Sequence, residues 1–71
     1  MARYIVNKNA QTTGEHEVHN LNACNRLPDP ANRIDLGEHY SCQSAVLAAK
    51  IIYSGSKVDG CYYCSPSCHT R

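Results

Sequence analysis

The stretch Gly-Cys-Tyr-Tyr-Cys-Ser-Pro-Ser-Cys-His-Thr, residues 60–70, holds three of the five cysteines and one of the four histidines of this chain. Cys61 and Cys64 have the C-x2-C spacing with which a tight turn grips one metal ion, and thiolate sulfur is a preferred ligand of zinc. Gly60 permits that turn. Because C-x2-C supplies only half of a four-ligand site, the other half must come from elsewhere in the chain.

Cys24 and His19 are the candidates for the other half of the site. Cys24 lies in a polar, irregular segment, five residues after His19 at the end of a predicted strand. Together with Cys61 and Cys64 they make a Cys3His set, a combination that tetrahedral structural zinc commonly uses. The sequence therefore predicts a zinc site formed by His19, Cys24, Cys61 and Cys64.

The end of the chain offers an alternative fourth ligand. Cys68 is four residues after Cys64, so both sulfurs would face one ion if the intervening residues are helical. The adjacent His69 is a further rival, and the sequence leaves the choice between these residues and His19 open. His16 and His39 have no partner motif and are predicted to be surface or strand residues.

The first half of the chain predicts a small antiparallel sheet. Residues 3–7 and 15–19 are β-rich and form the arms of a predicted hairpin around the polar, glycine-terminated turn 8–14. Residues 20–33 carry four asparagines and two prolines and are predicted to be an irregular loop. Residues 34–36 alternate again and suggest a third short strand, closed by the glycine that follows.

Residues 41–53 predict one helix with Ser41 as its N-cap and Ser54-Gly55 at its end. Leu47 and Ile51 add a second apolar stripe, which predicts a helix packed over much of its girth. Cys42 is interpreted as a small buried apolar side chain. The main predicted packing face consists of Cys42, Ala45, Val46, Ala49, Ile52 and Tyr53.

The fold class expected is α+β: a small antiparallel sheet packed on one central helix, with a C-terminal cysteine turn, in a single domain over residues 1–71. Ser65-Pro66 is predicted to start a last helical turn. A chain of 71 residues without Phe or Trp has a thin core. A core of that size rarely contributes more than about 3–5 kcal/mol to the free energy of unfolding, so a bound metal ion or a disulfide would add needed stability.

Composition also bears on location and partners. Residues 1–15 show no secretory signal and no run is long enough to span a membrane, which predicts a cytoplasmic location. In that compartment a cysteine cluster favours a metal or catalysis over disulfides. We expect a monomer. The net charge of +1 argues against a large nucleic-acid footprint and leaves a protein partner or a local nucleic-acid contact.

The order of these features resembles a known family. A ligand pair after a strand, Tyr40-Ser41-Cys42-Gln43-Ser44-Ala45 opening a helix, and then Gly60-Cys61-x2-Cys64-Ser65-Pro66 resemble the zinc-binding domain of Ada-type methylphosphotriester repair proteins. The resemblance implies a bacterial zinc module in which two ligands precede the strand–helix unit. It departs from the family at the widely spaced first pair, at Tyr62 and Tyr63 in place of basic residues, and in having no following helix-turn-helix. The tail also looks like small uncharacterised bacterial proteins.

Three functional hypotheses follow. The favoured one is a non-catalytic, zinc-stabilised interaction module. The second is a metal-free binding module that uses Tyr62, Tyr63 and the C-terminal tail. The third is a thiol-based DNA-repair or redox catalyst centred on Cys24 or Cys61.

Overall fold

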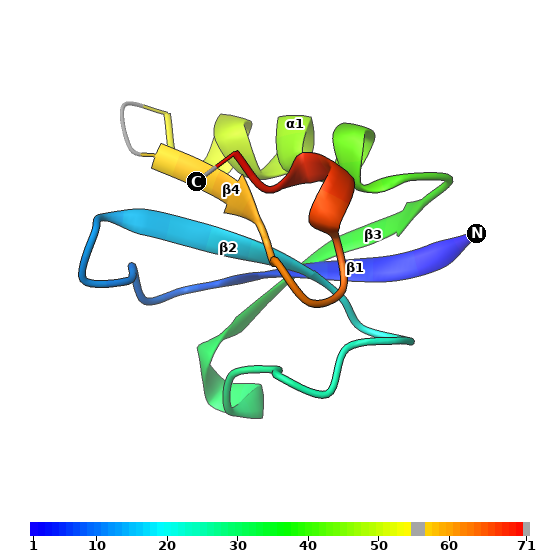
Figure 1. Cartoon of the computed structure of the whole chain (residues 1–71), viewed down its shortest axis with the longest axis horizontal. Coiled ribbons are helices and arrows are strands. Elements are labelled where there is room, and N and C mark those ends of the chain that lie inside the picture. The colour runs from blue at the N-terminus through cyan, green and yellow to red at the C-terminus, as the bar shows by residue number, and fades with distance from the viewer. Residues whose placement is uncertain (55–56, 71) are drawn as a thin grey trace.

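The computed structural model describes residues 1–54 and 57–70, in which one helix packs on a four-stranded sheet (Figure 1). The strand order is β3-β1-β2-β4. This arrangement confirms the α+β class. The elements in chain order are β1 (Ala2–Asn7), β2 (Glu15–Asn20), the 3-10 turn η1 (Pro30–Asn32), β3 (Arg33–His39), α1 (Cys42–Ile52), β4 (Lys57–Gly60) and the 3-10 turn η2 (Pro66–Cys68).

The predicted hairpin is confirmed. β1 and β2 pair antiparallel, with Val6 opposite Val18 and Ile5 opposite His19. The turn between them ends at Gly14, whose φ of 97° is a left-handed conformation that glycine adopts without steric cost. Because side chains alternate between the two faces of a strand, Val6 and Val18 share one face and Ile5 and His19 share the other.

The third strand is longer than predicted, because Gly37 lies inside it rather than closing it. The partner of Tyr4 on β3 is Gly37, whereas the partner of Ile5 is Asp35, so the register shifts by one residue. Gly37 has a φ of 82°, the conformation of a bulge glycine. The glycine thus absorbs an extra residue and lets pairing continue to His39.

The fourth strand was missed by the sequence analysis, which predicted an antiparallel sheet only. β4 pairs parallel to β2 at the sheet edge opposite β3, so the sheet is mixed. Parallel strands need a crossover connection, usually a helix, and α1 provides one from β3 to β4 (Figure 1). A four-residue strand that ends in Asp-Gly carries too little alternation to be recognised.

The helix packs through a narrower face than predicted. Cys42, Ala45 and Ala49 are buried with Tyr4, Val6 and Val18, and Val46 and Tyr53 pack at the edge of this cluster. The second apolar stripe is not covered: Leu47 is 63% and Ile51 81% exposed, and Ile52, placed on the packing face, is 47% exposed. Ser41 occupies the N-cap position without a side-chain cap hydrogen bond. The predicted stop at Gly55 lies outside the described residues.

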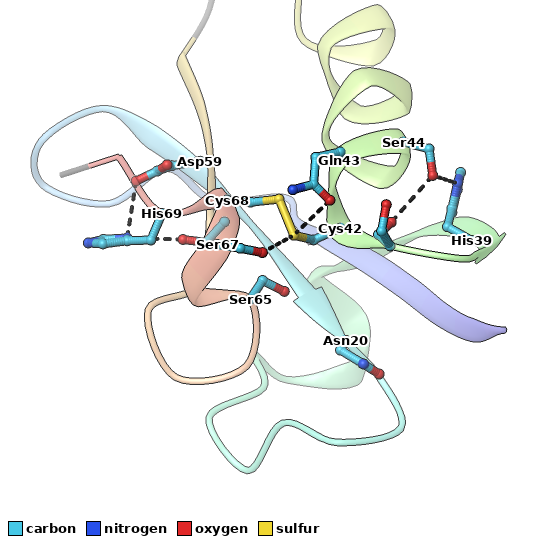
Figure 2. Close-up of a disulfide and its surroundings, with 12 residues drawn as sticks. Asn20, His39, Cys42, Gln43, Ser44, Asp59, Ser65, Ser67, Cys68 and His69 are labelled. Atoms are coloured by element: carbon cyan, nitrogen blue, oxygen red, sulfur yellow. Dashed lines mark hydrogen bonds and ion pairs between the residues drawn. A yellow bond between two sulfur atoms is a disulfide. The ribbon is translucent and has the colours of Figure 1, made fainter.

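A disulfide joins Cys42, the first residue of α1, to Cys68 at the end of η2. Cys42 is buried as predicted, but it is half of a disulfide rather than a free thiol, so the preference for metal or catalysis over disulfides fails for this pair. The helical turn predicted at Ser65-Pro66 is confirmed as η2, which carries Cys68 toward the helix (Figure 2). The disulfide links η2 to the start of α1, which is the one α-helix in the described residues.

Gly60 lies close to the segment Ser65–Cys68, and Gly60→Ala is expected to destabilise the fold by about 1–3 kcal/mol through overpacking. A Cβ on residue 60 would lie 2.6 Å from Cys68 Cβ and 2.9 Å from the Ser65 carbonyl oxygen. Urea unfolding measures the loss. Lys57→Ala, at an exposed position of the same strand, is the control and should change stability by less than about 0.5 kcal/mol. Equal midpoints for the two variants would contradict the close approach.

Candidate metal centre

The parallel pairing of β2 and β4 brings His19 and Cys61 together. Val18 is opposite Gly60, and the Cys61 amide donates to the Val18 carbonyl at 2.9 Å, so His19 on β2 and Cys61, the residue directly after β4, are neighbours. Both are buried, at 2% and 1% exposure. By strand alternation His19 lies on the sheet face opposite the one that Val18 presents to α1.

Cys24 reaches the same place through a tight turn after β2. The Cys24 amide donates to the Asn20 carbonyl at 2.9 Å, and the Asn22 amide donates to Asn20 Oδ1 at 3.0 Å. The turn is fixed to β1 because the Arg3 amide donates to Asn22 Oδ1 at 2.8 Å. The asparagines that mark this segment as a loop are thus the residues that position the cysteine.

The C-x2-C segment forms the predicted turn. The Ser65 amide donates to the Cys61 carbonyl at 2.8 Å, which closes the turn around the two cysteines. Cys64 Sγ accepts the backbone N–H of Asn20 at 3.3 Å. The Cys64 sulfur is therefore held at the end of β2, beside the turn that carries Cys24.

The four predicted side chains form one cluster. Their ligand atoms, one from each of His19, Cys24, Cys61 and Cys64, all lie within 4.8 Å of one another. Cys24 Sγ is 3.5 Å from His19 Nδ1 and 3.9 Å from Cys61 Sγ, and Cys64 Sγ is 3.9 Å from His19 Nδ1. Ligands about 2.0–2.3 Å from a tetrahedral ion are about 3.5–3.8 Å apart. The cluster therefore has the composition and spacing to hold a metal ion.

Burial is the largest influence on the pKa values of the cluster. Burial raises the pKa of the Cys61 thiol, against the opposing effect of the backbone N–H groups of Cys64 and Tyr63. Burial and the nearby Cys24 sulfur raise the pKa of Cys64 to about 12. Burial, and then the charge of Arg33, lower the pKa of His19. In the metal-free protein at pH 7, Cys61 and Cys64 are thus neutral thiols and His19 a neutral imidazole, the form that binds metals.

The Glu17 carboxylate lies beside the second nitrogen of the His19 ring. Glu17 Oε1 lies 3.7 Å from His19 Nε2, while Nδ1 faces the sulfurs of Cys24 and Cys64. Metal-binding histidines typically present their second ring nitrogen to a carboxylate or carbonyl in this way. Glu17 is not among the residues that the sequence predicted for the site. The two-residue spacing was the signal that could have identified it.

The alternative fourth ligands lie outside the cluster. Cys68 is in the disulfide, which rules it out in this structure and contradicts the prediction that it competes with His19. His69 Nδ1 lies 3.1 Å from the Gly60 carbonyl and 3.3 Å from the buried carboxylate of Asp59. His16 lies on β2 and stacks on Tyr53. His39 ends β3 and contacts Ser44 and the Leu36 carbonyl. Both are therefore strand residues, one of the two places predicted for them.

Tyr62 and Tyr63 project from the cysteine turn into solvent, at 62% and 60% exposure. Their rings meet edge to face at 5.3 Å, and the Arg26 guanidinium lies 4.1 Å from the Tyr63 ring centroid. Unlike Tyr4, which is buried, they do not contribute to the core. They form an exposed aromatic pair next to the cluster.

Comparison with known proteins gives no match to a family model, a curated protein or a solved structure. The resemblance to the Ada-type zinc domain therefore stays a prediction. In residues 1–54 and 57–70, no helix has the length and apolar character needed to cross a membrane.

Proposed function

We propose that this protein is a small zinc-stabilised module in which His19, Cys24, Cys61 and Cys64 bind one zinc ion and hold the fold together. The observation that carries the proposal is the convergence of these four ligand atoms within 4.8 Å, from a strand, a turn and a C-terminal knuckle. No other cluster of three or more such ligand groups occurs in the described part of the chain.

The donor set favours zinc and a structural role. Three thiolates and one imidazole suit a soft or borderline metal such as zinc and disfavour calcium and magnesium, which take oxygen ligands. Four protein ligands fill a tetrahedral ion and leave no position for a substrate or water. The raised pKa values of Cys61 and Cys64 also argue against an activated thiolate nucleophile at rest. We therefore propose a non-catalytic module.

The zinc would connect two segments that are far apart in the sequence. Cys24 belongs to the loop after β2, and Cys61 and Cys64 belong to the tail after β4. Cys24, Cys61 and Cys64 are not part of the helix-facing core that Val6 and Val18 form with α1, although Cys68 of the tail packs against it. A chain of 71 residues has one small apolar core, which lies between the sheet and α1. A metal on the opposite face of the sheet would stabilise the side that this core does not reach.

Zinc affinity is expected to rise steeply with pH, which tests the proposal. Because the pKa values of Cys61 and Cys64 are raised by the fold, both thiols carry protons at pH 7 and must lose them when zinc binds. The dissociation constant should therefore fall by at least about 100-fold per pH unit between pH 7 and 8, since two protons are released. Competition with a chromophoric zinc chelator measures the constant, and native mass spectrometry should count one zinc per chain.

The result that would sink the proposal is equally direct. A chain with its three free thiols reduced that takes up no zinc, or an affinity that does not change with pH, would contradict thiolate ligation. Glu38→Gln, an exposed carboxylate on β3, is the control and should leave the pH dependence unchanged.

The exposed tyrosine pair supports a second candidate function, a binding module that works without metal. Tyr62 and Tyr63 are large, exposed aromatic side chains, and Arg26 beside Tyr63 adds a cation. Such groups recur where proteins contact a protein groove or an unstacked base. The zinc titration separates the two candidates, because a metal-free module would be fully folded in chelator and would bind no zinc.

A further inference from the structure

A groove of about 310 Å³ lies beside the disulfide, on the side of Cys68. The walls are contributed by α1 and η2, and they combine apolar groups with one cation. The lining residues are Gln43, Val46, Leu47, Lys50, Ser67 and Cys68. Cys42, the other half of the disulfide, is not among them and is 5% exposed. A molecule in the groove would therefore meet Cys68 and not Cys42.

Two features favour Cys42 as the sulfur that leaves as a thiolate, against the burial of its side chain and the Gln43 Oε1 atom 3.7 Å from its sulfur. Cys42 is the first residue of an 11-residue helix, where the backbone N–H groups of the first turn have no helical partners and favour negative charge. Ser67 Oγ lies 3.3 Å from Cys42 Sγ, and its hydroxyl can donate to that sulfur (Figure 2). In thiol–disulfide exchange the sulfur that is stabilised as a thiolate departs faster.

The charge in the groove indicates what kind of thiol would enter. Lys50 is its one charged residue, and Val46 and Leu47 supply apolar contact. A small thiol that carries carboxylates and an aliphatic part fits this lining, whereas a cationic thiol would meet Lys50 with like charge.

We propose that the Cys42–Cys68 disulfide is a thiol-exchange site, at which a carboxylate-bearing low-molecular-weight thiol attacks Cys68 Sγ from this groove and displaces Cys42. The thiolate of the small molecule forms a bond to Cys68 Sγ, the Cys42–Cys68 bond breaks, and Cys42 leaves with the electron pair. A second thiolate of the same class attacks the sulfur of the bound small molecule and releases Cys68 as a thiolate. The protein disulfide is reduced, and two small thiols are oxidised to their disulfide. Their two protons pass through solvent to the protein thiols.

The test is the rate at which the full chain loses its disulfide in glutathione. Aliquots are alkylated over time, and mass spectrometry follows the modification of Cys42 and Cys68. The rate should increase in proportion to thiol concentration, because the folded protein is attacked. Lys50→Gln should slow the reaction with anionic glutathione about threefold at low salt. The same variant should not slow the reaction with cysteamine, which is cationic.

Ser67→Ala should slow exchange with both thiols about fivefold, the factor expected for the loss of one hydrogen bond of average strength. Lys57→Gln, an exposed cation on β4 outside the groove, is the matched control and should not change either rate. Exchange rates that are unchanged in both variants would overturn the proposal. So would a rate that is limited by unfolding and independent of thiol concentration, or a starting protein with five free thiols. Zinc content is measured separately, so a failure here is distinct from a failure of the zinc site.

Discussion

Removal of zinc is expected to lower the melting temperature by about 20–30 °C. A ligand present at 1,000 times its dissociation constant stabilises the folded state by about 4 kcal/mol. Each kcal/mol shifts the melting temperature of a domain of this size by about 4–8 °C. The effect is large because the ion would tie three separate segments together, at His19, at Cys24 and at the Cys61–Cys64 turn. Thermal melts followed by circular dichroism, with and without a chelator, measure it.

Two variants separate zinc ligation from general damage to the site. Cys64→Ser should abolish the dependence of the melting temperature on zinc, because a ligand is lost. Glu17→Gln leaves all four ligands in place and should weaken zinc binding by about 10- to 100-fold, as losing a carboxylate that orients a metal-bound histidine does. Glu38→Gln is the matched control for Glu17→Gln. Metal analysis must confirm that the chelated sample is zinc-free, and an unchanged melting temperature in that sample would refute a structural zinc.

The candidate site was easier to predict from sequence than the sheet that builds it. The spacing of Cys61 and Cys64 is a local signal, and a loop cysteine five residues after His19 had no core role to explain it. Ligand chemistry then limited the choice, since four soft donors complete a tetrahedron. The structure brings these four residues together. What it adds is the reason: the parallel register of β2 and β4, which makes His19 and Cys61 neighbours.

The errors have a common cause, which is long-range pairing. β4 is four residues long, and its identity depends on a partner strand some 40 residues earlier rather than on its own pattern. Cys42 fits a buried helix position equally well as a thiol or as half of a disulfide, and only the approach of η2 decides between them. The apolar stripe at Leu47 and Ile51 has the correct period for packing, but a sheet covers only one side of a helix. The local sequence pattern does not reveal whether a second layer will cover the other side of the helix.

Replacing both disulfide cysteines, Cys42→Ser with Cys68→Ser, is expected to destabilise the protein by about 3–4 kcal/mol. Cys42 and Cys68 are 26 residues apart, and closing a loop of that size restricts the unfolded chain by about this amount. Among the described residues, Tyr4 is the one fully buried aromatic side chain of the core and Tyr53 packs at its edge, so such a loss is a substantial part of the total stability. Urea unfolding of oxidised wild-type and double-variant protein, both loaded with zinc, measures the difference.

The double variant also tests whether the two cross-links act separately. The disulfide joins η2 to α1, whereas the zinc ligands lie on β2, the loop after it and the turn after β4. None of the four ligands is in the disulfide, so the double variant should still bind one zinc per chain. Loss of zinc binding in a variant that remains folded would show that η2 positions Cys61 and Cys64. A stability loss below about 1 kcal/mol would mean that the disulfide does not constrain the unfolded chain.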